Sequence, residues 1–310
     1  MKQLVLFIAG LVLAEVSLGQ FGNCLKNKDQ FIEISKESSF ITSLIQNSVI
    51  DPTIFIKRKN CSSRFLEYPK AVHETLHVFN SSYQVIQKSK PRDSFRFYLI
   101  STDSVRFIEK IKNLPTSKII GDTVSEEKWI SALRINTYLI DSIQDSSKNG
   151  IYGLLEEFSA YRISMESFNT LFSYSEQFDS KWLKEHFPEF YVSGNNVVMA
   201  YFEFHAFINY YLRHLSKTNK INFDNLMNSE FIELFSFLDK KFANEIEVWK
   251  KETTRYVSNE GSVEIKNDMI SSSFNLTKQW HSKISEINYS NDRLKEIVLF
   301  DKLYIPEIYK

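Results

Sequence analysis

The chain has 310 residues, a length that suits one two-lobed domain or two small domains. Of these residues 43% are hydrophobic, as in ordinary globular proteins. Its 38 Lys and Arg residues equal its 38 Asp and Glu residues, so the net charge is zero. This balance excludes binding to nucleic acid or to an anionic membrane surface by charge alone, and no basic cluster interleaved with aromatic residues contradicts it.

The N-terminus has the features of an export signal. Lys2 precedes an apolar run from Leu4 to Ala14, and Ser17-Leu18-Gly19 then suits signal peptidase. The run is too short to span a bilayer, and no comparable stretch follows it. We therefore expect residues 1–19 to be a signal peptide and the mature chain to have no transmembrane segment. Its location would be secreted, periplasmic or at the cell surface.

The sequence contains two cysteines, Cys24 and Cys61. In an exported protein they can form one disulfide, which would tie the mature N-terminus to the loop before the next helix. Alternatively, Cys24 carries a lipid anchor, because it lies close behind the apolar run, although Phe21-Gly22-Asn23-Cys24 is a poor lipobox. Lipidation would leave Cys61 unpaired, and the sequence leaves both alternatives open.

Residues 73 to 77 read His73-Glu74-Thr75-Leu76-His77, an H-E-x-x-H string. Pro69 suits the first turn of a helix, and no further Gly or Pro occurs until Pro91. Apolar residues recur here at spacings of three and four, which predicts one buried helix face: Val72, Leu76, Phe79 and Tyr83.

The two histidines lie one helical turn apart at the edge of this face. They can therefore share one metal ion, with Glu74 beside the open coordination position as a base. The alternative is that His73 and His77 are ordinary interfacial residues that bond to backbone groups, with Glu74 in solvent. A catalytic zinc site needs a third protein ligand, usually His or Glu, and no histidine follows His77 closely.

A distant glutamate is the natural third ligand. After the turn-like stretch that ends at Gly150, an amphipathic pattern from Ile151 to Phe172 predicts a helix. Glu157 projects to the edge of the apolar stripe, whereas Glu156 projects nearly opposite and is expected to face water. Because a carboxylate near a buried stripe is costly unless it is paired or binds a metal, Glu157 is the better candidate. The alternative is a solvated pair of glutamates.

The remaining pattern predicts an α+β fold that is predominantly helical. Thr53 to Lys57 and Phe95 to Ile100 read as short strands of a small N-terminal sheet that flanks the metal helix. Such a sheet could present an edge strand to an extended peptide. We expect an N-terminal mixed α/β lobe at 20–150 and a helical C-terminal lobe at 151–310. The helices predicted in the second lobe are Ile151 to Phe172, Asn196 to Leu215, Ser229 to Lys251 and Asn267 to Ile287.

Hydrolysis of a peptide bond also needs a hydrogen-bond donor for the developing oxyanion. Three residues are candidates for this donor: Tyr161, Tyr152 and His205. A plain packing role is the alternative for each of them.

These motifs resemble a known family. H-E-x-x-H followed far downstream by Glu157-Phe158-Ser159-Ala160 looks like the gluzincin branch of the zincin metallopeptidases. The segment from Tyr152 to Tyr161 is similar to poorly characterised, secreted bacterial zincin-like proteins. The resemblance covers two helices, and the spacer between His77 and Glu157 is much longer than in the thermolysin-like type.

The resemblance implies a zincin-like fold in which His73, His77 and Glu157 bind Zn²⁺ and Glu74 is the catalytic base. The chain would then be an exported metallopeptidase, a hydrolase that cleaves peptide or protein substrates by Glu-assisted attack of zinc-bound water. The second hypothesis is an exported binding or adhesion protein that keeps a zincin scaffold without turnover. The intact Glu74 favours the enzyme, because a purely structural zinc site needs no base.

Overall fold

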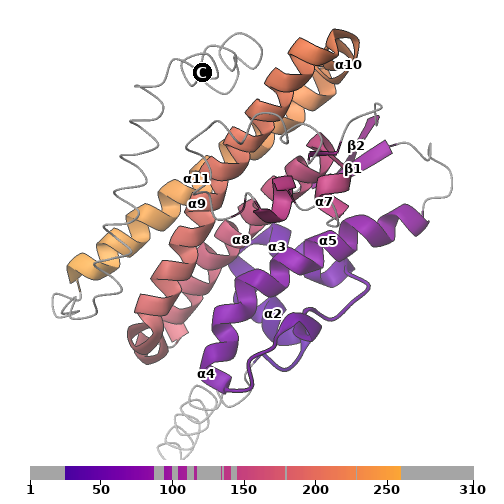
Figure 1. Ribbon diagram of the computed structural model, residues 1–310. Helices are drawn as coiled ribbons and strands as arrows, with labels where there is room; N and C mark the ends of the chain where they lie inside the picture. The colour runs from indigo at the N-terminus through magenta and orange to yellow at the C-terminus, as the bar shows by residue number, and fades with distance from the viewer. Residues whose placement is uncertain are drawn as a thin grey trace, which may run out of the picture.

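The computed structural model describes residues 25–86, 94–99, 104–109, 115–116, 134, 136–140, 145–178, 180–227 and 229–259. Long helices dominate these residues (Figure 1). In chain order the elements are α2 (Lys28–Ile34), η2 (Ser35–Glu37), α3 (Ser39–Asn47), η3 (Pro52–Phe55), α4 (Cys61–Arg64), η4 (Phe65–Glu67), α5 (Tyr68–Ile86), β1 (Ser94–Leu99), β2 (Ser104–Glu109), η8 (Asn136–Ile140), α7 (Asp145–Lys148), α8 (Ile151–Phe178), α9 (Ser180–Thr218), α10 (Lys220–Leu226) and α11 (Ser229–Asn259).

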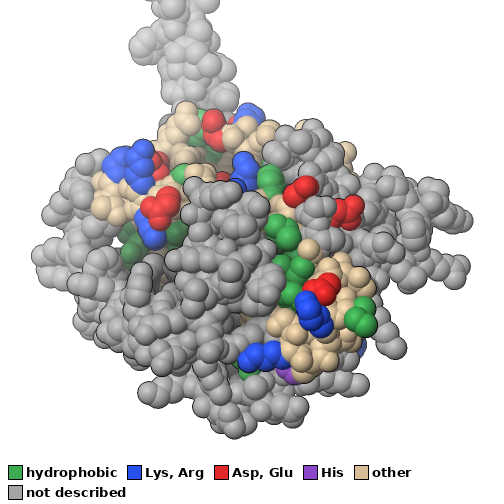
Figure 2. All heavy atoms as spheres, turned by 90° about the horizontal axis from the view of Figure 1, so that it is seen from above, with side chains coloured by type: hydrophobic (Ala, Val, Ile, Leu, Met, Phe, Trp, Pro, Cys, Tyr) green, Lys and Arg blue, Asp and Glu red, His purple; other side chains and the backbone are tan. Residues whose placement is uncertain are grey.

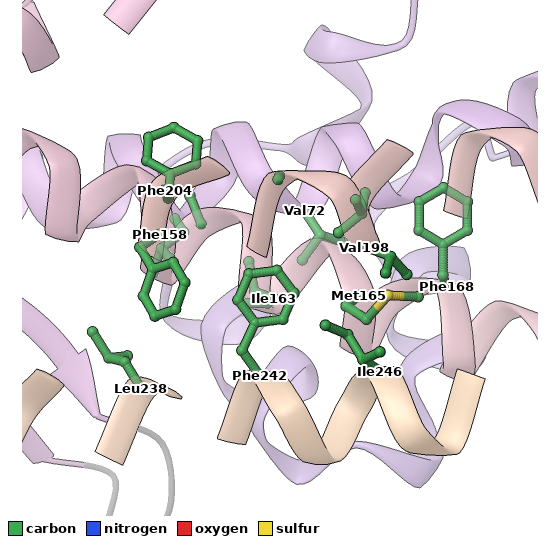
Figure 3. Packing of buried hydrophobic residues seen from close by; sticks show 14 of the residues in the cluster. Val72, Phe158, Ile163, Met165, Phe168, Val198, Phe204, Leu238, Phe242 and Ile246 are labelled. Atoms are coloured by element: carbon green, nitrogen blue, oxygen red, sulfur yellow. The ribbon is translucent and has the colours of Figure 1, made fainter. Parts of the chain in front are cut away.

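Helix α8 is the centre of the fold. It packs against α9 over the greatest length, and also against α5 and α11 (Figure 1). Its residues are buried on nearly every side, so its neighbours cover it almost completely. Figure 3 shows how α8 joins the other helices through apolar side chains, and the labelled examples are Val72, Phe158, Ile163, Met165, Phe168, Val198, Phe204, Leu238, Phe242 and Ile246.

Two glycines set the start of α8. Gly150 has a φ of 58°, a left-handed conformation that glycine adopts without steric cost and that commonly ends a helix, here α7. At Gly153 a Cβ atom would overlap the backbone carbonyl oxygen of Ser146. Only glycine at this position therefore lets α7 cross so closely over the first turn of α8. This crossing places η8, which contacts α7, beside the same end of α8.

The predicted α+β fold with an N-terminal sheet is wrong, because the described chain forms a helical fold. Thr53 to Lys57, predicted as a strand, begins with the 3₁₀ turn η3. Asp51 accepts a hydrogen bond from the Thr53 amide and Pro52 occupies the first position, which together favour a helical turn. The other predicted strand, Phe95 to Ile100, overlaps β1, and among the described residues β1 pairs with β2 alone, in an antiparallel hairpin.

The helix predicted around the H-E-x-x-H string is confirmed as α5, and those predicted from Ile151 and Ser229 are confirmed as α8 and α11. The helix predicted from Asn196 is part of the longer α9, which begins at Ser180. The helix predicted at Asn267 to Ile287 and the signal peptide at 1–19 lie outside the described residues. The lobe boundary at residue 150 stays a prediction.

Two surface properties bear on partners. None of the helices in the described ranges is long and apolar enough to cross a membrane. On the face in Figure 2, the acidic and basic side chains of the described residues are interspersed rather than gathered by sign. The interspersed charges agree with the balanced charge of the whole sequence.

Candidate metal centre

Helix α5 carries the two histidines at the border of its buried face. Val72 and Leu76 are fully or almost fully buried, and each is a sequence neighbour of one histidine. The side chains of His73 and His77 are 11% and 24% exposed. Their rings meet edge to face with centroids 4.9 Å apart, so both imidazoles point to the same side of α5.

Helix α8 brings Glu157 to that side of α5. The Glu157 side chain is 12% exposed, and its Oε2 lies 3.7 Å from His73 Nε2 and 3.6 Å from His77 Nε2. The two Nε2 atoms are 3.1 Å apart. The structure thus joins three side chains from two distant parts of the sequence into one group that can hold a metal ion.

The dimensions of this group match metal coordination. The nearest point that is equidistant from the three atoms, in their common plane, lies about 2.0 Å from each of them. Histidine nitrogen and carboxylate oxygen bind ions such as zinc at about 2.0 to 2.2 Å. The three atoms could therefore contact one such ion with no more than small side-chain adjustments.

The outer nitrogens of the histidines are held by hydrogen bonds. His73 Nδ1 is 3.0 Å from Ser164 Oγ, and this hydroxyl donates its own hydrogen to the Ala160 carbonyl. His73 Nδ1 must then be the donor to Ser164. His77 Nδ1 lies 3.4 Å from Glu156 Oε1, and a carboxylate can only accept. In the neutral imidazoles both Nε2 atoms therefore carry lone pairs directed at the group.

Three hydrogen-bond acceptors, His73 Nε2, His77 Nε2 and Glu157 Oε2, therefore lie close together in a buried position. Glu157 Oε2 has no hydrogen-bond partner among the described residues, because both Nε2 atoms lie beyond hydrogen-bonding distance. Three lone pairs in a buried space repel one another unless a positive charge lies between them. Either protons or a metal ion must supply that charge.

The side-chain pKa values reflect the electrostatic interactions within this group. Burial by itself would lower the pKa of His77, but contacts with Glu156 and Glu157 outweigh burial and raise it well above its ordinary value. Burial by itself would raise the pKa of Glu157, but contacts with His73 and His77 outweigh it and lower that pKa. The group therefore favours negative charge on Glu157 and positive charge beside it.

The prediction that Glu156 faces water is wrong. Its side chain is only 17% exposed and contacts His77. The helical projection failed because it assumed a solvent face opposite the apolar stripe, whereas α8 is covered on nearly all sides. Glu156 and Glu157, neighbours in sequence, approach opposite nitrogens of the same His77 ring.

Glu74, the predicted base, lies next to His73 on α5 and is partly buried. Its catalytic role stays a prediction. Of the three donor candidates, Tyr161 directly contacts a residue of the metal group, since its ring packs edge to face against His73 with centroids 4.9 Å apart. Tyr152 is fully buried in the core at the start of α8. His205 instead contacts Asp239 of α11, with His205 Nε2 3.7 Å from Asp239 Oδ1.

Sequence reasoning missed further residues near the group. Ser164 lies seven residues after Glu157, and the intervening Tyr161 lies four after it, a spacing that puts all three on one helix face and could have revealed Ser164. Arg134 and Tyr138 come from a segment without such a signal. Tyr138 Oη lies 3.3 Å from Tyr161 Oη, and the Arg134 guanidinium lies 4.8 Å from the Tyr161 ring centroid.

The surroundings of Arg134 and Tyr138 keep both residues protonated. Burial by itself would lower the pKa of Arg134, but contacts with Tyr161 and Glu203 outweigh it and raise that pKa. Burial raises the pKa of the Tyr138 hydroxyl, and the negative charge of Glu157 raises it further. A cation and a neutral phenol thus lie close to the metal group.

Cys24 lies outside the described residues, as does the side chain of Cys61, so the disulfide and the lipid anchor stay predictions. Comparisons with protein-family models, with curated proteins and with solved structures found no match to this chain.

Proposed function

We propose that this chain is an exported zinc-dependent metallopeptidase, with peptides or proteins as its substrates. The observation that carries the proposal is the convergence of His73 Nε2, His77 Nε2 and Glu157 Oε2 within 3.7 Å of one another. Two histidines and one glutamate are a common ligand set of catalytic zinc in peptidases, and they leave a fourth position open. The H-E-x-x-H string adds a carboxylate at Glu74, where such enzymes have their base.

Each residue has a distinct part in this proposal. A bound zinc ion would supply a Lewis acid that polarises the peptide carbonyl and lowers the pKa of water to about 7. Glu74 would accept the proton of the attacking water and return it to the leaving amine. Ser164 and Glu156 would orient His73 and His77 through their Nδ1 atoms, which fixes the lone pairs of the Nε2 atoms toward the ion.

The metal content of the purified full chain is the first test. We expect about one zinc ion per chain by mass spectrometry of the metals, and background levels in Glu157→Gln. Two histidines and one carboxylate also bind Fe²⁺ in oxygenases, so iron in place of zinc would contradict the peptidase and point to redox chemistry. Absence of any bound divalent ion, after incubation with zinc and dialysis, would overturn the proposal entirely.

Catalysis is tested by Glu74→Gln against a library of internally quenched peptides. This variant should keep its zinc and lose about 10²- to 10⁴-fold in hydrolysis, because the proton acceptor is removed without change of size. Glu185→Gln is the matched control, since Glu185 is an exposed glutamate of α9 with a side chain 58% accessible. A zinc-loaded wild-type chain that cleaves no peptide in the library would favour the non-catalytic binding or adhesion protein.

Export is proposed from the sequence of residues 1–19 alone. Expression with the intact N-terminus in a secreting host should yield a mature protein that begins at Gln20, as read by N-terminal sequencing. A product that retains Met1 in the cytoplasm would contradict export while leaving the metal site untouched.

A further inference from the structure

Tyr161 lies where four segments of the chain meet. Its ring packs edge to face against His73 of α5, and its hydroxyl lies 3.3 Å from the hydroxyl of Tyr138 in η8. Phe204 of α9 packs against both tyrosine rings, with centroid distances of 5.3 Å to Tyr161 and 4.9 Å to Tyr138. The Tyr161 ring is thus held beside one proposed metal ligand.

Arg134 is fixed over the Tyr161 ring. Its guanidinium carbon lies 4.8 Å from the ring centroid, within the range of a favourable cation–π interaction. Arg134 Nη1 donates to Glu203 Oε2 at 2.6 Å, and Nη2 donates to the Asn196 carbonyl at 2.8 Å. The side chains of Arg134 and Glu203 are only 13% and 5% exposed. Two anchors on α9 therefore hold the guanidinium in place.

This arrangement has a chemical consequence for the phenol. A cation over the ring withdraws electron density from it, which makes the Tyr161 hydroxyl a stronger hydrogen-bond donor. The Tyr138 hydroxyl can donate to Tyr161 Oη, which leaves the Tyr161 hydrogen free to point elsewhere. Tyr138 lies in a π-helical turn, an uncommon conformation that occurs frequently at functional sites.

We infer that Tyr161 donates its hydroxyl to the negative oxygen that develops on the substrate, and that Arg134 is the positioning residue that holds Tyr161 in this role. The inference rests on the proposed function and names a donor that the metal group itself lacks. Arg134 does not reach the substrate in this account, because Glu203 and Asn196 engage its Nη atoms. Its effect passes through the orientation and polarisation of the Tyr161 ring.

The test uses the full chain loaded with Co²⁺ and inorganic phosphate as the probe. Phosphate presents tetrahedral, negatively charged oxygens to the site, and the visible absorption of Co²⁺ reports its binding without any turnover. Tyr161→Phe should keep the metal and weaken phosphate binding about tenfold or more, because a hydrogen bond to a charged group is lost while the ring is retained.

Arg134→Met should weaken phosphate binding in the same direction. In the double variant with Tyr161→Phe, it should add nothing to the loss caused by Tyr161→Phe alone, because Arg134 acts through the Tyr161 hydroxyl. A purely structural role would instead add a second, independent loss. Arg255→Met is the matched control, because Arg255 forms an exposed ion pair with Glu176 on the outer surface of the helices.

Phosphate binding and metal content together distinguish a failure of this inference from a failure of the proposed function. Unchanged phosphate binding in Tyr161→Phe, with one metal ion per chain, would overturn the donor role and leave the metallopeptidase proposal standing. Additive losses in the double variant would overturn the positioning role of Arg134. If Arg134→Met does not fold, Arg134→Lys keeps the charge but loses the planar stacking, and it should show a partial loss that again disappears in the Tyr161→Phe background. A chain that binds no Co²⁺ would overturn both proposals.

Discussion

Helix α8 contributes to two buried clusters of charged residues, and the two clusters differ in how the buried charges are compensated. At Glu157, three acceptor atoms face one another across 3.1 to 3.7 Å. About one turn further along, Arg162 Nη1 donates to Glu166 Oε2 at 3.0 Å, and Ser38 Oγ donates to Glu166 Oε1 at 2.5 Å. The first cluster brings three acceptors together, whereas the second pairs a cation with a carboxylate, although Arg162 Nε and Nη2 have no hydrogen-bond partner among the described residues.

The difference shows which buried cluster depends on something outside the chain. Arg162 and Glu166 neutralise each other, and the guanidinium also lies over the Phe40 ring at 4.9 Å. This second cluster ties α8 to the start of α3, so its role is to hold the fold. Among the described residues of the Glu157 cluster, only the two histidines can carry a positive charge, so the cluster needs a metal ion or protons to be stable. Burial alone therefore does not identify a functional site. The sign of the buried groups does, because the Glu157 cluster joins three acceptors whereas the Arg162 cluster joins a cation and a carboxylate.

Removal of Arg162 should produce the largest loss of stability. Burial lowers the pKa of Arg162, against the opposing effect of Glu166 and Glu245, so the guanidinium is held in an environment that resists charge. Arg162→Met would leave Glu166 without its cation and should cost about 3 to 5 kcal/mol in the free energy of unfolding, measured with urea. The folded fraction should still bind one metal ion per chain.

Two controls sharpen this expectation. Arg255→Met removes an exposed arginine from α11 and should change the free energy of unfolding by about 1 kcal/mol at most. The double change Arg162→Met with Glu166→Gln should recover part of the stability, because no unpaired charge remains. A loss of metal binding in folded Arg162→Met would show that the two clusters are coupled, contrary to the comparison.

Removal of the metal by a chelator should destabilise the folded chain by a comparable amount. With free zinc at about a thousand times its dissociation constant, binding stabilises the folded state by about 4 kcal/mol, and a strong chelator should lower Tm by about 8 °C or more. Glu157→Gln should melt at the same temperature with and without the chelator. Calorimetry of both proteins checks this, and an equal chelator effect on the two would place the ion elsewhere.

The metal group was accessible from the sequence because it depends on helical geometry. His73 and His77 lie one turn apart, and Glu157 follows from the cost of a carboxylate near a buried stripe. Glu156 was misplaced for the same reason, since a helical projection cannot tell that neighbouring helices cover both faces of α8. Local periodicity predicts which residues share a face, but not how many faces are buried.

A local capping signal was overlooked when the fold class was predicted, and the surroundings of the site depend on contacts between residues far apart in sequence. Asp51 and Pro52 turn the predicted strand at Thr53 into a 3₁₀ helix, a capping effect that outweighed the β-branched residues nearby. Arg134 reaches Tyr161 and Glu203 only through the packing of η8, α8 and α9. Contacts between residues so far apart in sequence are set by tertiary structure, so the sequence alone could not supply them.

A substitution at Gly153 should disturb the Glu157 end of α8 by an intermediate amount. The added methyl group of Gly153→Ala would meet the Ser146 carbonyl, so α7 must move, and we expect a loss of about 1 to 3 kcal/mol in urea unfolding. Ser173→Ala is the matched control, because Ser173 is an exposed position of the same helix. An equally stable Gly153→Ala would mean that α7 does not pack against α8 as closely in solution.

The smallest effects should come from the residues that hold the histidines. Ser164→Ala and Glu156→Ala each remove the acceptor of one Nδ1 atom, so each should weaken zinc binding about 10- to 100-fold, measured by competition with a chromogenic chelator. Glu156→Gln keeps an acceptor oxygen but not its charge, and should lose less than Glu156→Ala. Glu185→Ala, at an exposed position, should have no effect. Full zinc affinity in both alanine variants would mean that the histidines need no hydrogen bonds from Ser164 and Glu156 to keep their Nε2 lone pairs directed at the ion. The three ligands alone would then determine the affinity of the site for zinc.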